Sequence, residues 1–140
     1  MIELFGAIVY CVYSDKERIL FRTSNEDFLY QSEAECCSET WIEDISFPEL
    51  LINEEIVGVS KCEFPEKIDD SRENHVIKTY GWALKTFKGV CDIEFRNASN
   101  GYYGGSLELV KDKYEVVVNS NQDMLKRTVT IDGNILKLIA

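Results

Sequence analysis

The sequence of 140 residues contains a single histidine, His75, and this scarcity limits the catalytic and metal chemistry that it can support. Zinc sites that need two or three histidines are excluded by count. A Ser-His-Asp or Cys-His centre would have to use His75, which lies in a polar segment with no serine or cysteine signature beside it. No Walker pattern and no G-x-G-x-x-G motif marks a phosphate-binding loop. The sequence therefore predicts no catalytic residue, no metal and no cofactor.

Basic residues are also scarce, because 15 Lys and Arg stand against 25 Asp and Glu and leave a net charge of −10. Binding to the phosphate backbone of a nucleic acid needs clustered Lys and Arg, so we expect no direct nucleic-acid binding. An acidic protein can instead meet a basic protein partner. The simpler alternative is a solvated surface that keeps the chain soluble.

Long apolar segments are missing too. No run approaches the ~20 residues that cross a bilayer, so we expect no membrane partner. The N-terminal segment has no basic region of the kind that opens a secretory leader. The cysteines show no disulfide-framework spacing, which favours reduced thiols and a cytoplasmic location. These cysteines are Cys11, Cys36, Cys37, Cys62 and Cys91.

Apolar residues instead recur with period two in short segments, which predicts a mainly β fold that borders on α+β. The length fits a single domain over residues 1–140, with an antiparallel sheet that is curved or forms two layers. One short helix is predicted near residues 48–53, where Pro48 suits the first helical position. A helical turn over 121–125 and an exposed polar loop over 65–75 are also predicted. The predicted strands cover 4–13, 18–23, 40–45, 55–64, 76–87, 90–96, 106–110, 114–119, 128–131 and 134–140, and another begins at Phe28.

The segment Glu35–Ile45, ECCSETWIEDI, contains two neighbouring thiols and a tryptophan. Cys36 and Cys37 can act as a thiol-redox sensor by closing a vicinal disulfide, or they can bind a soft metal. Their spacing is not that of a zinc site, and nearby acids disfavour the thiolate. Free cysteine is often a small apolar core residue, so we predict that the two thiols fill the core and that Trp41 lies in the interior.

The same segment also supplies carboxylates. On a strand, Glu43 and Asp44 would point to opposite faces, so they would not form a facing pair by themselves. We predict that Asp44 caps the short helix. In the alternative, Glu39, Glu43 or Asp44 converges with other polar groups in a pocket and serves a small-ligand or metal-dependent enzyme.

The loop Ser99–Gly105 combines glycines with Asn100, Tyr102 and Tyr103. Small flexible residues around tyrosines are typical of binding loops, because tyrosine supplies contact area at low entropic cost. The alternative is a hairpin turn whose two tyrosines pack back on the sheet.

Two stretches, Glu35–Ile45 and the SNGYYGGSLEL segment at Ser99–Leu109, resemble an uncharacterised family of small phage and bacterial domains of unknown function. The sequence differs from the family pattern at Phe47-Pro48, where a Gly-Asp turn is more usual. The resemblance implies a shared fold and brings no activity with it.

Our first hypothesis is a non-enzymatic protein-interaction module, phage-encoded, that binds through an acidic face and the Ser99–Gly105 loop. Its binding residues would be Asn100, Tyr102, Tyr103, Glu39 and Glu43. This hypothesis requires an exposed Tyr102 or Tyr103. The redox sensor requires an exposed Cys36 or Cys37, and the enzyme requires a polar pocket at the carboxylates. The sequence does not predict an oligomeric state, since edge strands can pair between copies.

Overall fold

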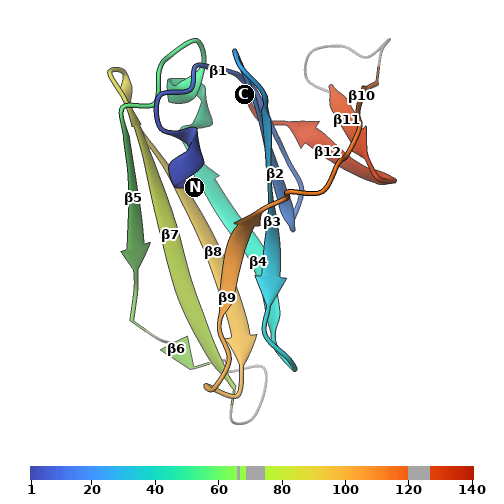
Figure 1. Cartoon of the computed structure of the whole chain (residues 1–140). Coiled ribbons are helices and arrows are strands. Elements are labelled where there is room, and N and C mark those ends of the chain that lie inside the picture. The colour runs from blue at the N-terminus through green and yellow to red at the C-terminus, as the bar shows by residue number, and fades with distance from the viewer. Residues whose placement is uncertain (66, 69–74, 120–126) are drawn as a thin grey trace.

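The computed structural model of the chain describes residues 1–65, 67–68, 75–119 and 127–140. Two antiparallel β-sheets face each other across a shared apolar core (Figure 1). The helical elements are two short 3-10 helices, η1 (Ile2–Leu4) and η2 (Pro48–Leu51). The strands are β1 (Val9–Ser14), β2 (Arg18–Thr23), β3 (Asp27–Ala34), β4 (Glu39–Ser46), β5 (Gly58–Glu63), β6 (Lys67–Ile68), β7 (Val76–Thr86), β8 (Gly89–Ser99), β9 (Gly105–Leu109), β10 (Val116–Val118), β11 (Thr128–Ile131) and β12 (Asn134–Leu138).

The first sheet is a curled half-barrel with the strand order β10-β11-β12-β1-β2-β3-β9. The second sheet has the order β4-β8-β7-β5, and β6 pairs with β7 beside it. The chain crosses from the first sheet to the second between β3 and β4, and it returns between β8 and β9. Both crossings lie at the same end of the molecule, the lower end in Figure 1. This arrangement brings two sequence-distant loops together.

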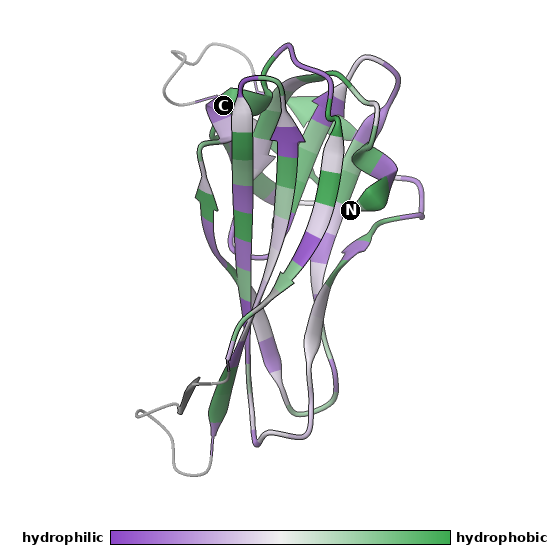
Figure 2. Cartoon of the chain, turned by 90° about the vertical axis from the view of Figure 1, so that its left-hand side faces the viewer, coloured by the Kyte–Doolittle hydropathy of each residue, from purple (hydrophilic) through white to green (hydrophobic). Residues whose placement is uncertain are grey.

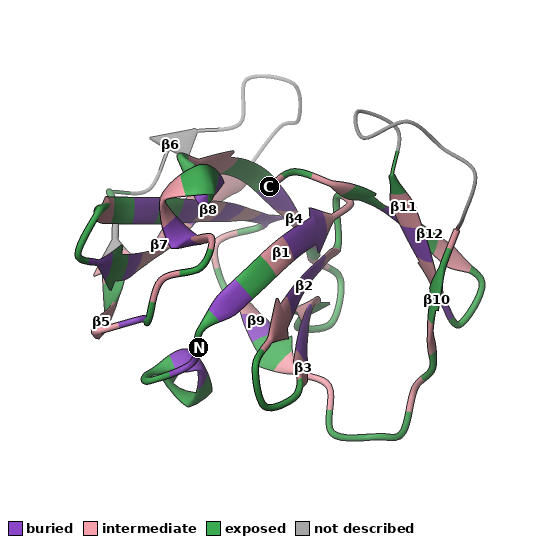
Figure 3. Ribbon diagram, turned by 90° about the horizontal axis from the view of Figure 1, so that it is seen from above, coloured by how far each residue is buried: buried purple, intermediate pink, exposed green. Residues whose placement is uncertain are grey.

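The main core lies between the two sheets. Val12 and Phe21 of the first sheet pack in one apolar cluster with Leu84, Ile93 and Phe95 of the second. Figure 3 shows the buried residues concentrated where β1 and β2 face β7 and β8. Since such burial removes roughly 25 cal/mol of unfavourable hydration per Å² of apolar surface, this cluster is the main stabilising element of the fold.

A second apolar cluster covers the other side of the first sheet. Leu20 and Leu29 there contact Val129, Ile131 and Leu136 from the last hairpin. Strands β1 to β3 are therefore apolar on both faces. The alternation of hydrophobic and hydrophilic residues along several of the longer strands is visible in Figure 2.

The mainly β, antiparallel, layered fold is confirmed. The first predicted strand is too long, because residues 2–4 form η1 and Gly6 turns the chain at a φ of 83° before β1 begins at Val9. The short helix predicted near 48–53 is the 3-10 helix η2. The predicted loop over 65–75 includes β6, which pairs with Val76 and Ile77. The predicted helical turn over 121–125 lies outside the described residues.

Within the described ranges, no helix has the length and apolar character that a membrane-spanning segment requires.

Candidate interaction surface at one end of the two sheets

Two loops meet where the chain crosses between the sheets, and we call residues 35–38 and 99–104 together the loop end. The backbone N–H of Glu35 donates a hydrogen bond of 3.2 Å to the carbonyl oxygen of Gly104. Both loops lie at the lower end of the molecule in Figure 1. The predicted redox residues and the predicted binding tyrosines therefore belong to one surface.

The first of these loops is a tight turn stabilised by its last residue. Ser38 donates to the carbonyl oxygen of Glu35 through its backbone N–H at 3.1 Å and through Oγ at 2.6 Å. Cys37, between them, adopts a left-handed conformation with a φ of 64°.

Cys36 and Cys37 are consequently exposed, and their sulfur atoms lie 3.2 Å apart. The prediction that these thiols fill the core is wrong, because a tight turn occupies the positions where a continued strand would have buried one of them. The hydrogen-bonding contact with Cys37 raises the pKa of the Cys36 thiol, so Cys36 holds its proton to higher pH than an isolated cysteine. Exposure of at least one thiol, which the sensor hypothesis requires, is present.

The second loop is ordered by hydrogen bonds from its own side chains. The buried Ser99 Oγ accepts from the backbone N–H of Gly101 at 3.0 Å and donates to the carbonyl oxygen of Tyr103 at 3.1 Å. Asn100 Oδ1 accepts from the backbone N–H of Tyr102 at 3.1 Å. Gly101 has a φ of 99°, a conformation that only glycine adopts without strain. The loop therefore has a defined shape of its own.

Tyr102 stands out from this ordered loop with 88% of its surface exposed, whereas Tyr103 is half-buried. The alternative in which both tyrosines pack back on the sheet is wrong for Tyr102. Exposed tyrosines on shaped loops are typical of binding surfaces, because the ring offers a large contact area with few rotatable bonds.

A buried polar cluster supports both loops from inside. The Nδ2 of Asn97, which is fully buried, donates to Ser38 Oγ and to Thr40 Oγ1 at 3.0 Å each. Gly105 contacts Thr40 so closely that a Cβ at position 105 would overlap Thr40 Oγ1. The sequence did contain a signal for Asn97. The inward positions 91, 93 and 95 of β8 recur with period two, and the same period continues to positions 97 and 99.

Carboxylates that are exposed, apart from the half-buried Glu94, extend from the loop end along the outer face of β4 and β8. Trp41 Nε1 donates to Glu43 Oε2 at 2.7 Å, and Arg96 forms ion pairs with Glu43 at 3.6 Å and with Glu94 at 3.1 Å. Arg96 is the only basic residue in these two strands. We call this group the acidic strip, and it consists of Glu39, Glu43, Asp44, Asp92 and Glu94.

Trp41 belongs to this outer face and is only half-buried, so the prediction of an interior Trp41 is wrong. The residue of this segment that enters the core is Ile42, which is 8% exposed. Hydrophobicity alone does not tell which phase of an alternating segment faces inward when both Trp41 and Ile42 are apolar.

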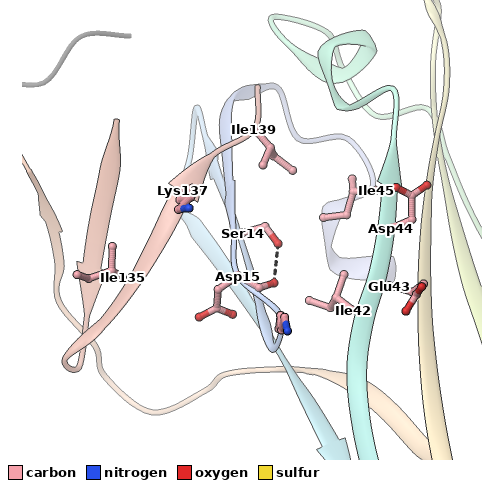
Figure 4. Close-up of a pocket in the computed structure, with 10 residues that line it drawn as sticks. Ser14, Asp15, Ile42, Glu43, Asp44, Ile45, Ile135, Lys137 and Ile139 are labelled. Atoms are coloured by element: carbon pink, nitrogen blue, oxygen red, sulfur yellow. Dashed lines mark hydrogen bonds between the residues drawn. The ribbon is translucent and has the colours of Figure 1, made fainter. Parts of the chain in front are cut away.

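A bulge in β4 changes the direction of the next side chains. The pairing register with β8 shifts between Ile42 and Asp44. As a result Ile42 and Ile45 point to one side of the strand, and Glu43 and Asp44 point to the other (Figure 4). The prediction that Glu43 and Asp44 face opposite ways is wrong, because the extra residue of a bulge breaks the period of two.

The predicted cap is also wrong. Asp44 accepts a hydrogen bond of 2.6 Å from Ser46 Oγ. The residue that precedes η2 is Phe47, and it forms no side-chain hydrogen bond to the helix.

A cleft of about 500 Å³ lies between β4 and the first sheet, and Figure 4 shows its walls. Ile42 and Ile45 point into it, while the carboxylates of Glu43 and Asp44 point away. The carboxylate of Asp15 accepts from the backbone N–H groups of Glu17 and Arg18 at 2.8 and 2.7 Å, so it stabilises a turn. The lining residues are Ser14, Asp15, Lys16, Ile42, Glu43, Asp44, Ile45, Ile135, Lys137 and Ile139.

The structure thus does not bring the carboxylates of Glu39, Glu43 and Asp44 together in the cleft. Across the part of the chain that the structure describes, no group of three or more His, Cys, Asp or Glu side chains is arranged to hold a metal ion. The two loops that do come together, through the hydrogen bond between Glu35 and Gly104, carry Cys36 and Cys37 in one and Asn100, Tyr102 and Tyr103 in the other.

A family model described as a domain of unknown function (DUF7448) matches residues 3–109. This range contains both loops of the loop end and the whole acidic strip, and it ends with β9. No curated protein and no solved structure matches the chain.

Proposed function

The chain belongs to DUF7448, a family of domains of unknown function, and we propose that it is a non-enzymatic protein-interaction module. In this proposal the loop end makes the central contact with a partner protein, and the acidic strip beside it selects a basic partner surface.

The exposure of Tyr102 is the observation that carries the proposal. The residue is 88% exposed, yet three hydrogen bonds within the Ser99–Tyr103 loop fix the backbone that presents it. A loop that is already ordered loses little conformational entropy when a partner binds. Tyrosine is also among the residues that contribute most to binding energy at protein interfaces.

Charge supports a basic partner. The net charge is −10, and the acidic strip has five carboxylates against the single guanidinium of Arg96. Opposite charges around a contact raise the association rate and fix the orientation of the complex. Nucleic acid is not part of the proposal, because its polyanionic backbone does not complement the acidic strip. A membrane is not part of it either, because the strip complements neither an anionic nor an apolar surface. The resemblance to phage and bacterial domains makes a cytoplasmic host or phage protein the partner class that we propose.

Site-specific photo-crosslinking in the native cell tests the proposal. A photoreactive phenylalanine analogue is placed at position 102 in one variant and at position 87 in the other. Phe87 is a matched control, because it is 86% exposed and lies at the far end of the β7–β8 hairpin. We expect a discrete crosslinked protein from position 102 and none from position 87. Equal crosslinking from both positions, or crosslinking from position 87 alone, contradicts the proposal.

A further inference from the structure

We propose that Cys36 and Cys37 form an oxidisable dithiol site that gives two electrons to a low-molecular-weight disulfide of the glutathione type and closes to a vicinal disulfide. We further propose that this closure changes the shape of the Tyr102 loop. The second statement rests on the proposed function, since it makes oxidation a regulator of partner binding. The first statement concerns the thiols alone.

Exposure and proximity distinguish this pair from the other cysteines. Both side chains are exposed and their sulfur atoms lie 3.2 Å apart. Cys91 is buried, and Cys11 and Cys62 are half-buried. Thiol–disulfide exchange needs access to the attacking sulfur, so the oxidant reaches Cys36 and Cys37 first.

The reaction balances with the named oxidant. The thiolate of one cysteine attacks a sulfur of the small disulfide, the S–S bond of that disulfide breaks, and one thiolate leaves and takes a proton. The thiolate of the second cysteine then attacks the protein-side sulfur of the mixed disulfide and displaces the other small thiol. Two thiol hydrogens leave the protein, the protein sulfurs are oxidised, and one small disulfide is reduced to two thiols.

The bond so formed is easily reduced again. Adjacent Cα atoms lie ~3.8 Å apart across a trans peptide. Unstrained disulfides have Cα atoms roughly 4.4–6.8 Å apart, so a bridge between neighbours is strained, and strain makes a disulfide more reducible. Reversibility is what a regulatory site requires.

Hydrogen bonds connect the dithiol to the Tyr102 loop. Glu35 and Ser38 flank the two cysteines. Glu35 bonds across the loop end, and Ser38 bonds to β8, the strand that leads into the Tyr102 loop. The Glu35 N–H bonds to the Gly104 carbonyl oxygen at 3.2 Å, and Ser38 Oγ accepts from Asn97 at 3.0 Å. Drawing the two sulfurs together to the ~2.05 Å of a disulfide changes the turn between these anchors. The change is therefore transmitted to Gly104 and the loop that precedes it.

The test equilibrates the full chain with mixtures of reduced and oxidised glutathione and follows two readouts. Mass spectrometry of alkylated peptides reports the state of each cysteine, and amide NMR shifts report Gly101 and Gly104. We expect the peptide with Cys36 and Cys37 to lose its two thiol hydrogens while Cys91 stays reduced. We expect the amide signals of Gly101 and Gly104 to move with the same midpoint. Cys37→Ser is the matched control and should stop at the mixed disulfide.

Two results would overturn the inference. Accumulation of glutathione mixed disulfide on the unmodified chain, without closure, refutes the vicinal bridge. Closure with unchanged amide signals at Gly101 and Gly104 refutes the link to the Tyr102 loop. A Cys36→Ser/Cys37→Ser variant separates this inference from the proposed function, because it cannot be oxidised at this turn. If position 102 still crosslinks in that variant, the interaction module is supported independently of the thiols. If position 102 does not crosslink in the reduced chain with both cysteines, the interaction module is contradicted and the thiol chemistry is not.

Discussion

The backbone N–H of Glu35 donates to the carbonyl oxygen of Gly104, and this one hydrogen bond joins the two places where the chain crosses between its sheets. The dithiol follows Glu35 in one loop, and the exposed Tyr102 precedes Gly104 in the other. Because the two loops are distant in the sequence, this surface forms only in the folded chain. Substitutions of single residues test which contacts hold it in shape.

Tyr102→Ala should leave the free energy of unfolding unchanged within about 0.5 kcal/mol, because an exposed side chain away from packing contributes little to stability. Tyr30→Ala is the contrasting change. Tyr30 is fully buried and packs edge-to-face on Phe21, so its truncation should cost about 3–5 kcal/mol. Urea denaturation of both variants measures the difference. A destabilisation by Tyr102→Ala comparable to that of Tyr30→Ala would show that Tyr102 is a structural residue.

Ser99→Ala should loosen the Tyr102 loop. The change removes the acceptor of the Gly101 N–H and the donor to the Tyr103 carbonyl, and leaving such groups unsatisfied costs about 1–3 kcal/mol. We expect faster hydrogen exchange at the Gly101 amide together with lower stability. Ser24→Ala, at an exposed turn, is the control and should change neither quantity. Unchanged exchange at Gly101 in Ser99→Ala would mean that the loop is ordered by other contacts.

Gly105→Ala should destabilise the fold by about 1–3 kcal/mol, because the added methyl group meets Thr40 and an overpacked site must shift its neighbours. Gly58→Ala is a suitable control. Its added methyl group would lie 3.3 Å from Lys85 Cβ, a tight contact but a much milder one than that with Thr40, so the variant should lose less stability. Thermal or urea unfolding of the two variants gives the comparison, and equal stabilities would contradict the close approach of β9 to β4.

Stability should fall at alkaline pH, partly through Cys91. Burial raises the pKa of its thiol from 9.0 to about 12, and the charges of Asp92, Glu49 and Asp44 add to the rise. Between these two values the unfolded chain has lost a proton that the folded chain keeps. The free energy of unfolding therefore decreases as pH rises, by at most about 1.4 kcal/mol per pH unit for this one group.

Cys91→Ala removes that contribution, so its stability should decline less steeply than that of the unmodified chain above about pH 9, where the unfolded thiol ionises. Some decline remains, because burial also raises the pKa of Tyr30. Urea titrations at several alkaline pH values give the two slopes. Parallel slopes would show that Cys91 ionises as freely in the folded chain as in the unfolded one.

Most of the fold could be predicted from period-two alternation. The segment 90–96 illustrates why: Cys91, Ile93 and Phe95 all enter the core, and the charged residues between them stay outside. Period-two patterning shows which face of a strand is buried, and it can be read from the sequence without knowing the sheet topology.

The candidate site was harder to predict, because its features depend on local geometry. The turn at Cys36 and Cys37 and the bulge after Ile42 each interrupt the alternation, and neither has a glycine or proline that would mark it in the sequence. The meeting of residues 35 and 104 depends on the sheet topology, which hydrophobic patterning does not specify. The exposure of Tyr102 followed from neither propensity nor pattern, since a loop tyrosine can equally pack on a sheet.

The most direct measurement is the dissociation constant of the purified chain for the protein crosslinked from position 102, compared among the unmodified chain, Tyr102→Ala and Phe87→Ala. We predict that Tyr102→Ala weakens binding by about tenfold or more, as expected when a central interface aromatic is removed, and that Phe87→Ala leaves it unchanged. An affinity that Tyr102→Ala leaves intact, or that Phe87→Ala reduces as much, would contradict the assignment of the loop end as the binding surface.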